Sequence, residues 1–323
     1  MSSLRDIHQQ IHHEIRPLVE AIHHPSMPKM RKLSVPDARA FADKLNRGNK
    51  APLVQVGDIH SINIPGPEHT IAANLLLPPE KSAPYGVIVW LHGGGWVLGT
   101  LEDSMRSARK VCAETGAAVL TVDYRLAPEH IFPAAVEDAF ASVRWVSNEG
   151  SKYNLDPTRV AVGGESAGGN LAAVCALAAR DGLIPELTAQ MLVYPVLDND
   201  FARSSYETYS EGLLLETPDM KWFWDHYHPE HESNRDWRAM PIAAESLRGV
   251  APTIMVIADL DPLRSENEHY VERLRADDVA VEVIRLRDVP HGSFGFGESS
   301  KAIRDIVHQS CGVLASHLKI EQP

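Results

Sequence analysis

From Gly86 to the C-terminus, short apolar runs alternate with helix-like stretches, and this alternation restricts the fold more than any other feature of the chain. The runs are apolar at consecutive positions, as in GVIVWLH at 86–92, whereas a strand buried on one face alternates apolar and polar residues. Strands that are apolar on both faces are typical of parallel sheets covered by helices on both sides. We therefore expect an α/β fold with a mainly parallel central sheet flanked by helices.

The order of the runs predicts the individual elements. Further strands are expected at 117–124, 159–164, 189–195, 252–258 and 279–286. Helices are expected around 105–114, 134–147, 167–179, 266–275 and 301–318. Upstream of the alternation, from about Leu53, apolar residues recur at every second position, which predicts strands with one exposed face.

The N-terminal residues follow the helical period instead. Apolar residues spaced by three or four positions predict one helix with a single apolar stripe, formed by Leu4, Ile7, Ile11, Ile15, Leu18 and Ile22. Pro25 and Pro28 are expected to end this helix, and a second short helix is expected after Pro36.

A break in the alternation divides the chain. Residues 198–250 are rich in aromatic and polar side chains and lack strand character, so we expect a helical insertion that packs with the N-terminal helices. This predicts an N-terminal helical part at 1–50, a main α/β domain formed by 51–197 and 251–323, and the insertion at 198–250.

Composition and charge exclude several classes of protein. The formal net charge of −12 argues against a nucleic-acid-binding protein, which would carry a basic patch. Three widely spaced cysteines predict buried free thiols and no disulfide framework. No apolar run approaches the ~20 residues that span a bilayer, and no apolar leader is visible, so we expect no membrane span and a cytoplasmic location. His8 and His12 have the spacing of zinc ligands on a helix, but no Glu or Cys completes a site, so no metal is expected.

A candidate nucleophile lies between an expected strand and an expected helix. Residues 164–168 spell Gly-Glu-Ser-Ala-Gly, and Ser166 is therefore the central residue of a G-x-S-x-G motif. In a nucleophile elbow the flanking glycines avoid steric clashes in a sharp turn, and the following helix N-terminus favours developing negative charge. The alternative is a glycine-rich turn that packs tightly or binds phosphate, but no phosphate-binding motif is present.

A serine hydroxyl needs a base, and the base needs an orienting acid. His291 is the candidate base because it follows the last strand-like run, in a glycine-rich loop before the final helix. Asp259 and Asp261 end the strand at 252–258, and Asp198 follows the strand at 189–195, so all three carboxylates fit the position of the acid. Position alone favours Asp261 without excluding the other two.

Five motifs in order give the chain a specific resemblance. HGGGW (92–96), DYRLAPEHIFPAAVEDA (123–139), GESAGGN (164–170), DLDPLR (259–264) and HG (291–292) resemble the hormone-sensitive-lipase-like carboxylesterases, the HGGG-containing branch of the α/β-hydrolases. The resemblance extends from about Val87 to the C-terminus and is weakest in the N-terminal helices and in 198–250. It implies the α/β-hydrolase fold, with the N-terminal helices and the insertion forming a helical cap over the site.

The resemblance also implies an activity and its residues. Members cleave short- to medium-chain acyl esters through an acyl-enzyme and need no metal or cofactor. The expected binding partner is therefore a small-molecule ester substrate. By resemblance, Ser166 is the nucleophile, His291 the base and Asp261 the acid. The amides of Gly94, Gly95 and Ala167 would form the oxyanion hole, with Gly93 as the turn, although sequence alone does not separate the three glycines. Members often form homodimers through the last strand and helix.

Two further activities fit the same motifs. The same triad would serve hydrolysis of a lactone, an amide or an acetylated secondary metabolite, and a non-catalytic ligand receptor on this fold would lack the histidine that this chain keeps. The chain departs from the family pattern in the nucleophile motif, where Glu165 replaces the aspartate of many members, and little effect on the chemistry is expected. It departs again at Ser265, where members often have another aspartate, and in the base loop, which reads HGSFGF where many read HGF; these departures bear on substrate preference. The charged residues Asp123, Arg125 and Glu129 are interpreted as an ion-pair scaffold beside HGGGW.

Aromatic side chains in the insertion are the remaining candidates for the site. Trp222, Phe223, Trp224 and Tyr227 lie in the insertion, and Trp96 follows the glycines. Such residues are more often core than ligand-binding, but in a segment that flanks the site some of them could line the substrate pocket.

Overall fold

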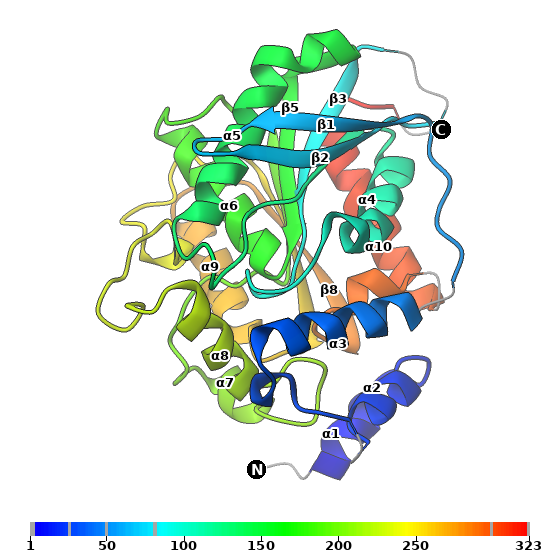
Figure 1. The fold of residues 1–323 in the computed structure, drawn as a ribbon, viewed down its shortest axis with the longest axis vertical. Helices are drawn as coiled ribbons and strands as arrows, with labels where there is room; N and C mark the ends of the chain where they lie inside the picture. Colours follow the sequence, from blue (N-terminus) through cyan, green and yellow to red (C-terminus); the bar gives the residue numbers. More distant parts are fainter. Residues whose placement is uncertain (1–3, 25–26, 49–50, 80–82, 298–299, 322–323) are drawn as a thin grey trace.

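The computed structural model describes residues 4–24, 27–48, 51–79, 83–297 and 300–321. Its centre is an eight-stranded sheet with the strand order β1-β2-β4-β3-β5-β6-β7-β8 (Figure 1). The strands are β1 (Ile59–Pro65), β2 (Thr70–Leu76), β3 (Tyr85–Leu91), β4 (Ala118–Val122), β5 (Leu155–Glu165), β6 (Ala189–Val193), β7 (Thr253–Leu260) and β8 (Val281–Pro290). From β4 to β8 every neighbouring pair is parallel, whereas β1 and β2 add an antiparallel edge. The expected mainly parallel sheet is confirmed.

Helices cover both faces of the sheet. They are α4 (Leu101–Thr115), α5 (Ala134–Glu149), α6 (Ala167–Arg180), α9 (Arg264–Ala276) and α10 (Lys301–His317). Along β3, Val87, Val89 and Leu91 join the core with α5, α6 and α9, whereas Ile88 and Trp90 join the core with α4 and α10. Each strand therefore buries both faces, which is why its sequence is apolar at consecutive positions.

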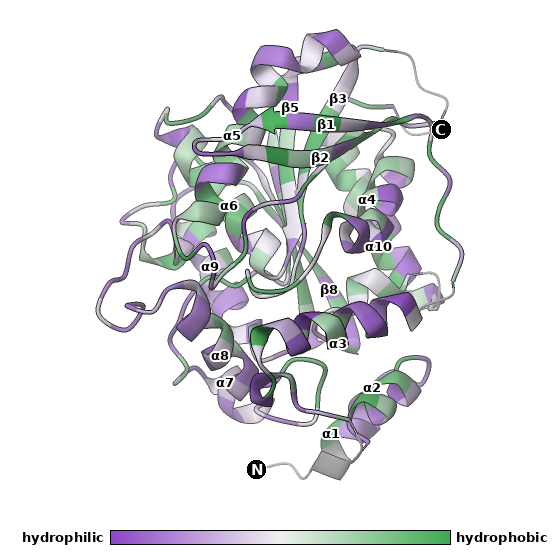
Figure 2. Ribbon diagram, viewed as in Figure 1, coloured by the Kyte–Doolittle hydropathy of each residue, from purple (hydrophilic) through white to green (hydrophobic). Residues whose placement is uncertain are grey.

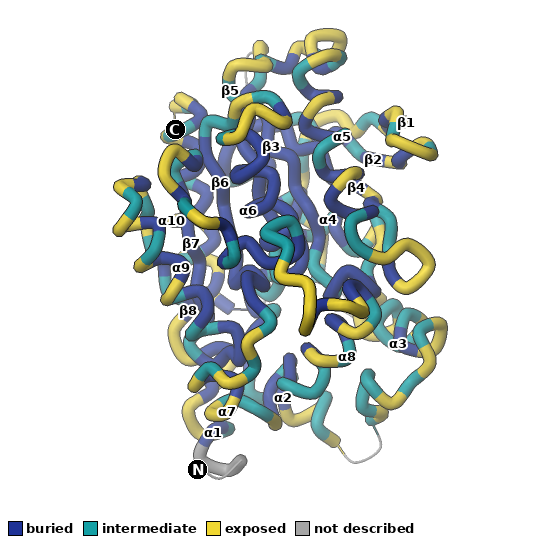
Figure 3. The backbone as a smooth tube through the Cα atoms, turned by 90° about the vertical axis from the view of Figure 1, so that its left-hand side faces the viewer, coloured by how far each residue is buried: buried dark blue, intermediate teal, exposed yellow. Residues whose placement is uncertain are grey.

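The burial of the central strands is continuous. Every residue from Gly86 to Leu91 is buried, and Figure 3 shows the central strands in dark blue with exposed segments at the periphery. Figure 2 shows the same separation by hydropathy, with green strands at the centre and hydrophilic residues along much of α3 (Val35–Gly48). The hydrophobic core holds the sheet rigid, so that side chains at its edge have fixed positions.

The N-terminal stripe forms two short helices, and the expectation of one continuous helix is wrong. The helices are α1 (Leu4–Gln10) and α2 (Arg16–Ile22), and Pro17 lies in the first turn of α2. Proline lacks the N–H that would continue a helix from residue 13, and its ring clashes with the preceding turn. Three apolar residues of the stripe, Ile7, Ile11 and Ile15, are nevertheless buried, and Leu18 and Ile22 are partly buried. Pro25, expected to end the helix, lies outside the described residues.

The expected helix after Pro36 is confirmed as α3, which begins at Val35. The insertion contains two helices, α7 (Ser204–Thr208) and α8 (Thr217–Tyr227), and much of the rest of 198–250 is turns and irregular backbone. Three short 3₁₀ segments, at Met30–Lys32, Gly150–Tyr153 and Pro241–Ala243, complete the connections before β7. No strand forms between residues 198 and 250, all of which the structure describes.

The insertion contacts the N-terminal segment, as its composition predicted. The Nε2 atom of His8 lies 2.7 Å from the carbonyl oxygen of Gly212, and that of His23 lies 2.8 Å from the carbonyl oxygen of Leu213. The Nζ of Lys29 donates to Glu216 Oε1 at 2.7 Å. These polar contacts join residues that are 187 to 204 positions apart in the sequence. The exact domain boundaries remain a prediction.

Candidate active site

Ser166 occupies a tight turn between β5 and α6. Its backbone angles are φ 56° and ψ −117°, a conformation that non-glycine residues rarely adopt. A Cβ on Gly164 would lie 2.4 Å from the carbonyl oxygen of Leu91, and a Cβ on Gly168 would lie 2.0 Å from the same oxygen. Both distances are far below van der Waals contact, so the glycines of the G-x-S-x-G motif are required for the turn to pass β3.

The turn is also held by backbone hydrogen bonds. The amide of Ser166 donates to the carbonyl oxygen of Val193, the last residue of β6, at 2.9 Å. The serine is the residue directly before α6, so the positive end of that helix dipole lies beside it. The strained serine is therefore placed at the carboxyl edge of the sheet, where ligands bind in open α/β folds.

The three glycines after β3 form the neighbouring loop. A Cβ on Gly93 would lie 3.5 Å from the Cβ of Ser166, which places the loop against the serine. Gly94 and Gly95 have φ angles of 113° and 59°, in the region that favours glycine. Among the described residues, none accepts a hydrogen bond from the amides of Gly94, Gly95 or Ala167. These N–H groups are therefore available to an oxygen atom placed beside the serine.

His92 supports this loop from the protein interior. Its Nδ1 lies 2.7 Å from the carbonyl oxygen of Gly93, and its ring stacks on Tyr124 with centroids 4.2 Å apart. The hydroxyl of Tyr124 donates to the carbonyl oxygen of His92 at 2.8 Å. Burial lowers the pKa of His92, so the ring is neutral. These contacts agree with a structural role for this histidine.

His291 and Asp261 form the closest pairing between the candidate base and an acid. The Nδ1 of His291 lies 2.7 Å from Asp261 Oδ2, and both side chains are buried. The other carboxylate oxygen accepts the backbone N–H of Leu263 at 2.8 Å, which fixes the orientation of the carboxylate. The histidine therefore presents its Nε2 away from the acid.

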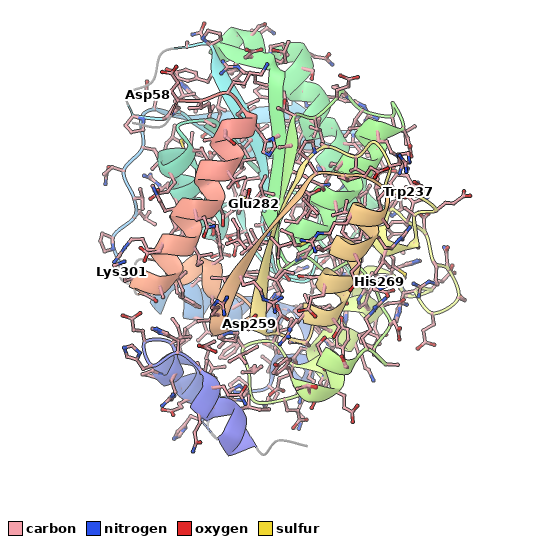
Figure 4. The ribbon with its side chains drawn as sticks, turned by 180° about the vertical axis from the view of Figure 1, so that it is seen from behind. Asp58, Trp237, Asp259, His269, Glu282 and Lys301 are labelled. Atoms are coloured by element: carbon pink, nitrogen blue, oxygen red, sulfur yellow. The ribbon has the colours of Figure 1, made fainter. Side chains whose placement is uncertain are left out.

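The other two carboxylates are occupied elsewhere. Asp198 pairs with Arg203 at 2.7 Å and with Arg235 at 2.8 Å. Asp259, which Figure 4 labels, lies near the end of β7 and pairs with Arg285 at 2.7 Å. Of the three acids that fit by position, the structure brings only Asp261 to His291.

Ser166 and His291 both line one cavity of about 310 Å³. The glycine loop, through Gly93, Gly94 and Gly95, lines it as well. Its apolar wall comes mainly from the N-terminal segment and the insertion, through Ile22, Met30, Phe41, Leu45, Leu213, Leu214, Leu215 and Phe223. The two segments flanking the α/β domain therefore shape the space beside the serine.

Polar and charged side chains also line this cavity. His23 and Lys29 come from the N-terminal segment, and Glu216 and Asp219 come from the insertion. Glu216 accepts hydrogen bonds from Lys29 and Arg31, each at 2.7 Å. Sequence reasoning missed these residues and the leucines at 213–215, because nothing in their local pattern indicates proximity to the serine.

Of the five aromatic candidates, Phe223 lines the cavity. Trp96 stacks on Tyr227 with centroids 4.1 Å apart and packs against Trp224 at 5.0 Å, and all three are fully buried. They form the joint between the glycine loop and α8. Trp222 packs against the core from a partly buried position.

Two residues of the charged motif after β4, Arg125 and Glu129, form ion pairs as interpreted from the sequence, and the role of Asp123 stays a prediction. Arg125 pairs with the buried Asp138 at 2.9 Å, and Glu129 pairs with Arg39 of α3 at 2.7 Å. Ser265 accepts a hydrogen bond from the amide of Ser205 at 3.0 Å, which docks α7 onto α9.

Within the described residues, no group of three or more His, Cys, Asp or Glu side chains is arranged to hold a metal ion.

Comparisons with known proteins agree with this geometry. A family model described as the alpha/beta hydrolase fold matches residues 88–295, a range that includes Ser166, Asp261 and His291. The chain is 40% identical over 263 residues to the carboxylic ester hydrolase LipN of Mycobacterium tuberculosis, covering 79% of this chain and 69% of that protein. It is 33% identical to the ethyl acetate hydrolase of Pseudomonas putida, covering 71% and 73%. A solved thermostable esterase from Pseudomonas putida matches with a TM-score of 0.89 at 32% identity, covering 96% of this chain and 98% of that one.

Proposed function

Because the chain belongs to the hormone-sensitive-lipase-like branch of the α/β-hydrolase family, we propose that it is a carboxylic ester hydrolase in which Ser166, His291 and Asp261 form the catalytic triad. The observation that carries the assignment of residues is the strained serine sharing a cavity with a histidine whose Nδ1 is held by a buried carboxylate. A carboxylate at Nδ1 fixes the tautomer in which Nε2 is free to accept a proton.

In the first half of the reaction, Ser166 Oγ attacks the ester carbonyl carbon while His291 Nε2 takes the hydroxyl proton. Asp261 stays ionised and stabilises the imidazolium that forms. The imidazolium then donates its proton to the leaving alcohol oxygen as the C–O bond breaks, which leaves an acyl-enzyme.

The amides of Gly94, Gly95 and Ala167 stabilise the tetrahedral oxyanion. Support comes from their lack of an internal acceptor among the described residues and from the position of the loop against Ser166. The N-terminus of α6 adds to the favourable potential. Each such donor contributes roughly 10²–10³ to the rate.

In the second half, a water molecule attacks the acyl carbon and His291 again acts as the base. The proton that His291 takes from water is returned to Ser166 Oγ as the acyl-enzyme breaks down. The products are the carboxylic acid and the free enzyme, and no cofactor or metal takes part in any step.

The cavity supports short- to medium-chain esters as substrates. Its volume of about 310 Å³ lies at the small end of the range for ligand sites, and most of its side chains are apolar. An acyl or alcohol chain of a few carbons fits such a space, whereas a long chain would extend beyond it.

We also propose a cytoplasmic location and a homodimer. The three cysteines are free and buried, and burial raises the pKa of Cys112 to about 12, as for thiols that are kept reduced and unreactive. None of the described helices is long and apolar enough to span a bilayer. The homodimer is supported by the position of β8 at one edge of the sheet, and size-exclusion chromatography with light scattering tests it.

The test of the proposed function is hydrolysis of p-nitrophenyl esters from acetate to laurate, with a lactone and an aryl amide in the panel. We expect the short and medium esters to react fastest and Ser166→Ala to abolish turnover. A burst of p-nitrophenol equal to the enzyme concentration would reveal the acyl-enzyme. Unchanged ester hydrolysis by Ser166→Ala would refute the proposal. If the lactone or the amide is turned over faster than the esters, that compound is the preferred substrate.

A further inference from the structure

A second polar network joins the nucleophile turn to the histidine loop. Glu165, directly before Ser166, accepts a hydrogen bond from the hydroxyl of Tyr194 at 2.7 Å through Oε2. Its other oxygen accepts a hydrogen bond from the hydroxyl of Ser107 on α4. The carboxylate is therefore fixed from two sides, by α4 and by the residue that follows β6.

Tyr194 connects this carboxylate to the proposed base. Its ring packs against the imidazole of His291, with centroids 4.5 Å apart and planes inclined by 52°. The backbone amide of Phe294, three residues beyond His291, also approaches the phenol oxygen. Tyr194 thus contacts both the ring of the histidine and the loop that carries it.

The backbone of Tyr194 is tied to the nucleophile as well. The preceding residue, Val193, accepts the amide hydrogen bond of Ser166, and the amide of Tyr194 donates to Val256 of β7 at 2.7 Å. Tyr194 has a φ angle of 35°, a strained value for a non-glycine residue. Such strain persists where surrounding contacts fix the residue, and it is concentrated at functional sites.

The protonation state of the phenol is also defined. Burial, and then the charge of Glu165, raise the pKa of Tyr194 well above its ordinary value. The phenol therefore stays protonated and donates to the carboxylate, which makes the contact a charge-assisted hydrogen bond.

We infer that Glu165 and Tyr194 are positioning residues that hold the imidazole of His291 in line with Ser166. Asp261 fixes the Nδ1 edge of the imidazole, and Tyr194 supports the ring from a different direction. Glu165 keeps the tyrosine in place and links it to the backbone of the nucleophile. This inference rests on the proposed function, because it requires His291 to act as the base.

The test is a double-mutant cycle of Tyr194→Phe and Glu165→Gln, assayed with p-nitrophenyl butyrate. Both substitutions preserve side-chain size: Tyr194→Phe removes the hydrogen bond to Glu165, and Glu165→Gln removes the charge that strengthens it. We expect each to lower kcat about tenfold, the size of one such bond, with KM within about twofold. Because both act on the same interaction, the double variant should lose about tenfold as well, instead of about a hundredfold.

A matched control separates positioning from general stability. The hydroxyl of Tyr206 donates to the buried Glu266 at 3.0 Å, a second Tyr–carboxyl contact outside the triad. Tyr206→Phe should lower the melting temperature with kcat within twofold of the unmodified protein. Labelling of Ser166 by a fluorophosphonate should slow in Tyr194→Phe and not in Tyr206→Phe.

The outcomes separate the two proposals. If Ser166→Ala is inactive while Tyr194→Phe and Glu165→Gln keep kcat within twofold, the positioning role is refuted and the triad stands. Effects that multiply in the double variant, or that raise KM with unchanged kcat, also refute it. If Tyr194→Phe does not fold, the kcat and KM of Glu165→Gln decide alone. An active Ser166→Ala variant would instead overturn the proposed function.

Discussion

Gly95→Ala tests how the glycine loop and the insertion share the site. An alanine Cβ at this position would lie 2.2 Å from Cδ1 and 2.3 Å from Cγ of Phe223 on α8. The base of the ring, which has little freedom to swing away, is the part in conflict. Either the phenyl ring moves into the cavity or the loop shifts away from Ser166.

The size of the effect follows from two separate costs. Gly95 has a φ angle of 59°, and a Cβ in that left-handed region costs about 1–2 kcal/mol. Displacing one oxyanion donor costs roughly 10²–10³ in kcat, or about 2.7–4 kcal/mol. We therefore expect Gly95→Ala to lower kcat about 10²–10³-fold. The part of the loss in kcat that comes from the clash with Phe223 should be recovered when Phe223 is replaced by alanine. The part that comes from the left-handed backbone at residue 95 should remain.

The assay compares four proteins on p-nitrophenyl acetate: unmodified, Gly95→Ala, Phe223→Ala and the double variant. We expect the double variant to reach within about tenfold of Phe223→Ala, since only the left-handed Cβ cost remains. Gly94→Ala, alone and combined with Phe223→Ala, is the matched control, because its Cβ would meet the backbone oxygen of Leu98 at 2.2 Å and Phe223→Ala cannot relieve that contact. The steric reasoning is refuted if Phe223→Ala restores kcat in neither of the two glycine variants. It is also refuted if Phe223→Ala restores kcat in both Gly94→Ala and Gly95→Ala.

Side-chain pairs elsewhere in the structure lead to three further predictions. Asp261→Asn should lower kcat by about 10³–10⁴ because the correct tautomer of His291 is lost. Asp259→Asn breaks only the pair with Arg285 and should keep kcat within about threefold, so equal losses in ester assays would contradict the assignment of the acid. Asp138→Asn should lower the free energy of unfolding in urea by about 3 kcal/mol, because it removes the buried carboxylate that pairs with Arg125. The kcat of the folded enzyme should not change, and an unchanged unfolding midpoint would contradict the prediction. Burial raises the pKa of Glu216, but hydrogen bonds from Gly212, Lys29 and Arg31 outweigh this effect and hold the pKa of the folded protein below 4.5. The carboxylate therefore stabilises the fold fully above its ordinary pKa, and this stabilisation is lost as the pH falls through the pKa of the folded protein. The difference in melting temperature between the unmodified protein and Glu216→Gln should shrink below pH 4.5, and a constant difference would contradict the reasoning.

The sheet and the nucleophile turn were predictable because their signals are local. Consecutive apolar residues identify strands buried on both faces, and the glycines at 164 and 168 mark the place where β5 must pass close to β3. The break between α1 and α2 was also visible in the sequence as Pro17, but the regular apolar stripe concealed it. The stripe reports which residues are buried, and it does not report whether the backbone between them is helical.

The walls of the cavity could not be predicted in the same way. Phe223 and Trp224 are neighbours on α8, yet Phe223 lines the cavity and Trp224 packs in the core. The difference depends on how α8 lies against the glycine loop, which is set by contacts with Trp96. Likewise Tyr194 follows an ordinary buried strand, and only the spacing between the ends of β6 and β8 brings it to His291.

Backbone strain gives a common reason why local rules fail at this site. Trp96, Ser166 and Tyr194 all have positive φ angles, which cost on the order of 1–3 kcal/mol each. Each is held by contacts from another part of the chain: Trp96 stacks on Tyr227, the amide of Ser166 donates to the last residue of β6, and the amide of Tyr194 donates to Val256 within β7. The strain is therefore maintained by tertiary structure, and sequence propensities point away from these conformations. Loosening any one of these contacts should relax the turn it holds, so the rigidity of the sheet edge is itself a requirement for aligning the glycine loop, the serine and the histidine.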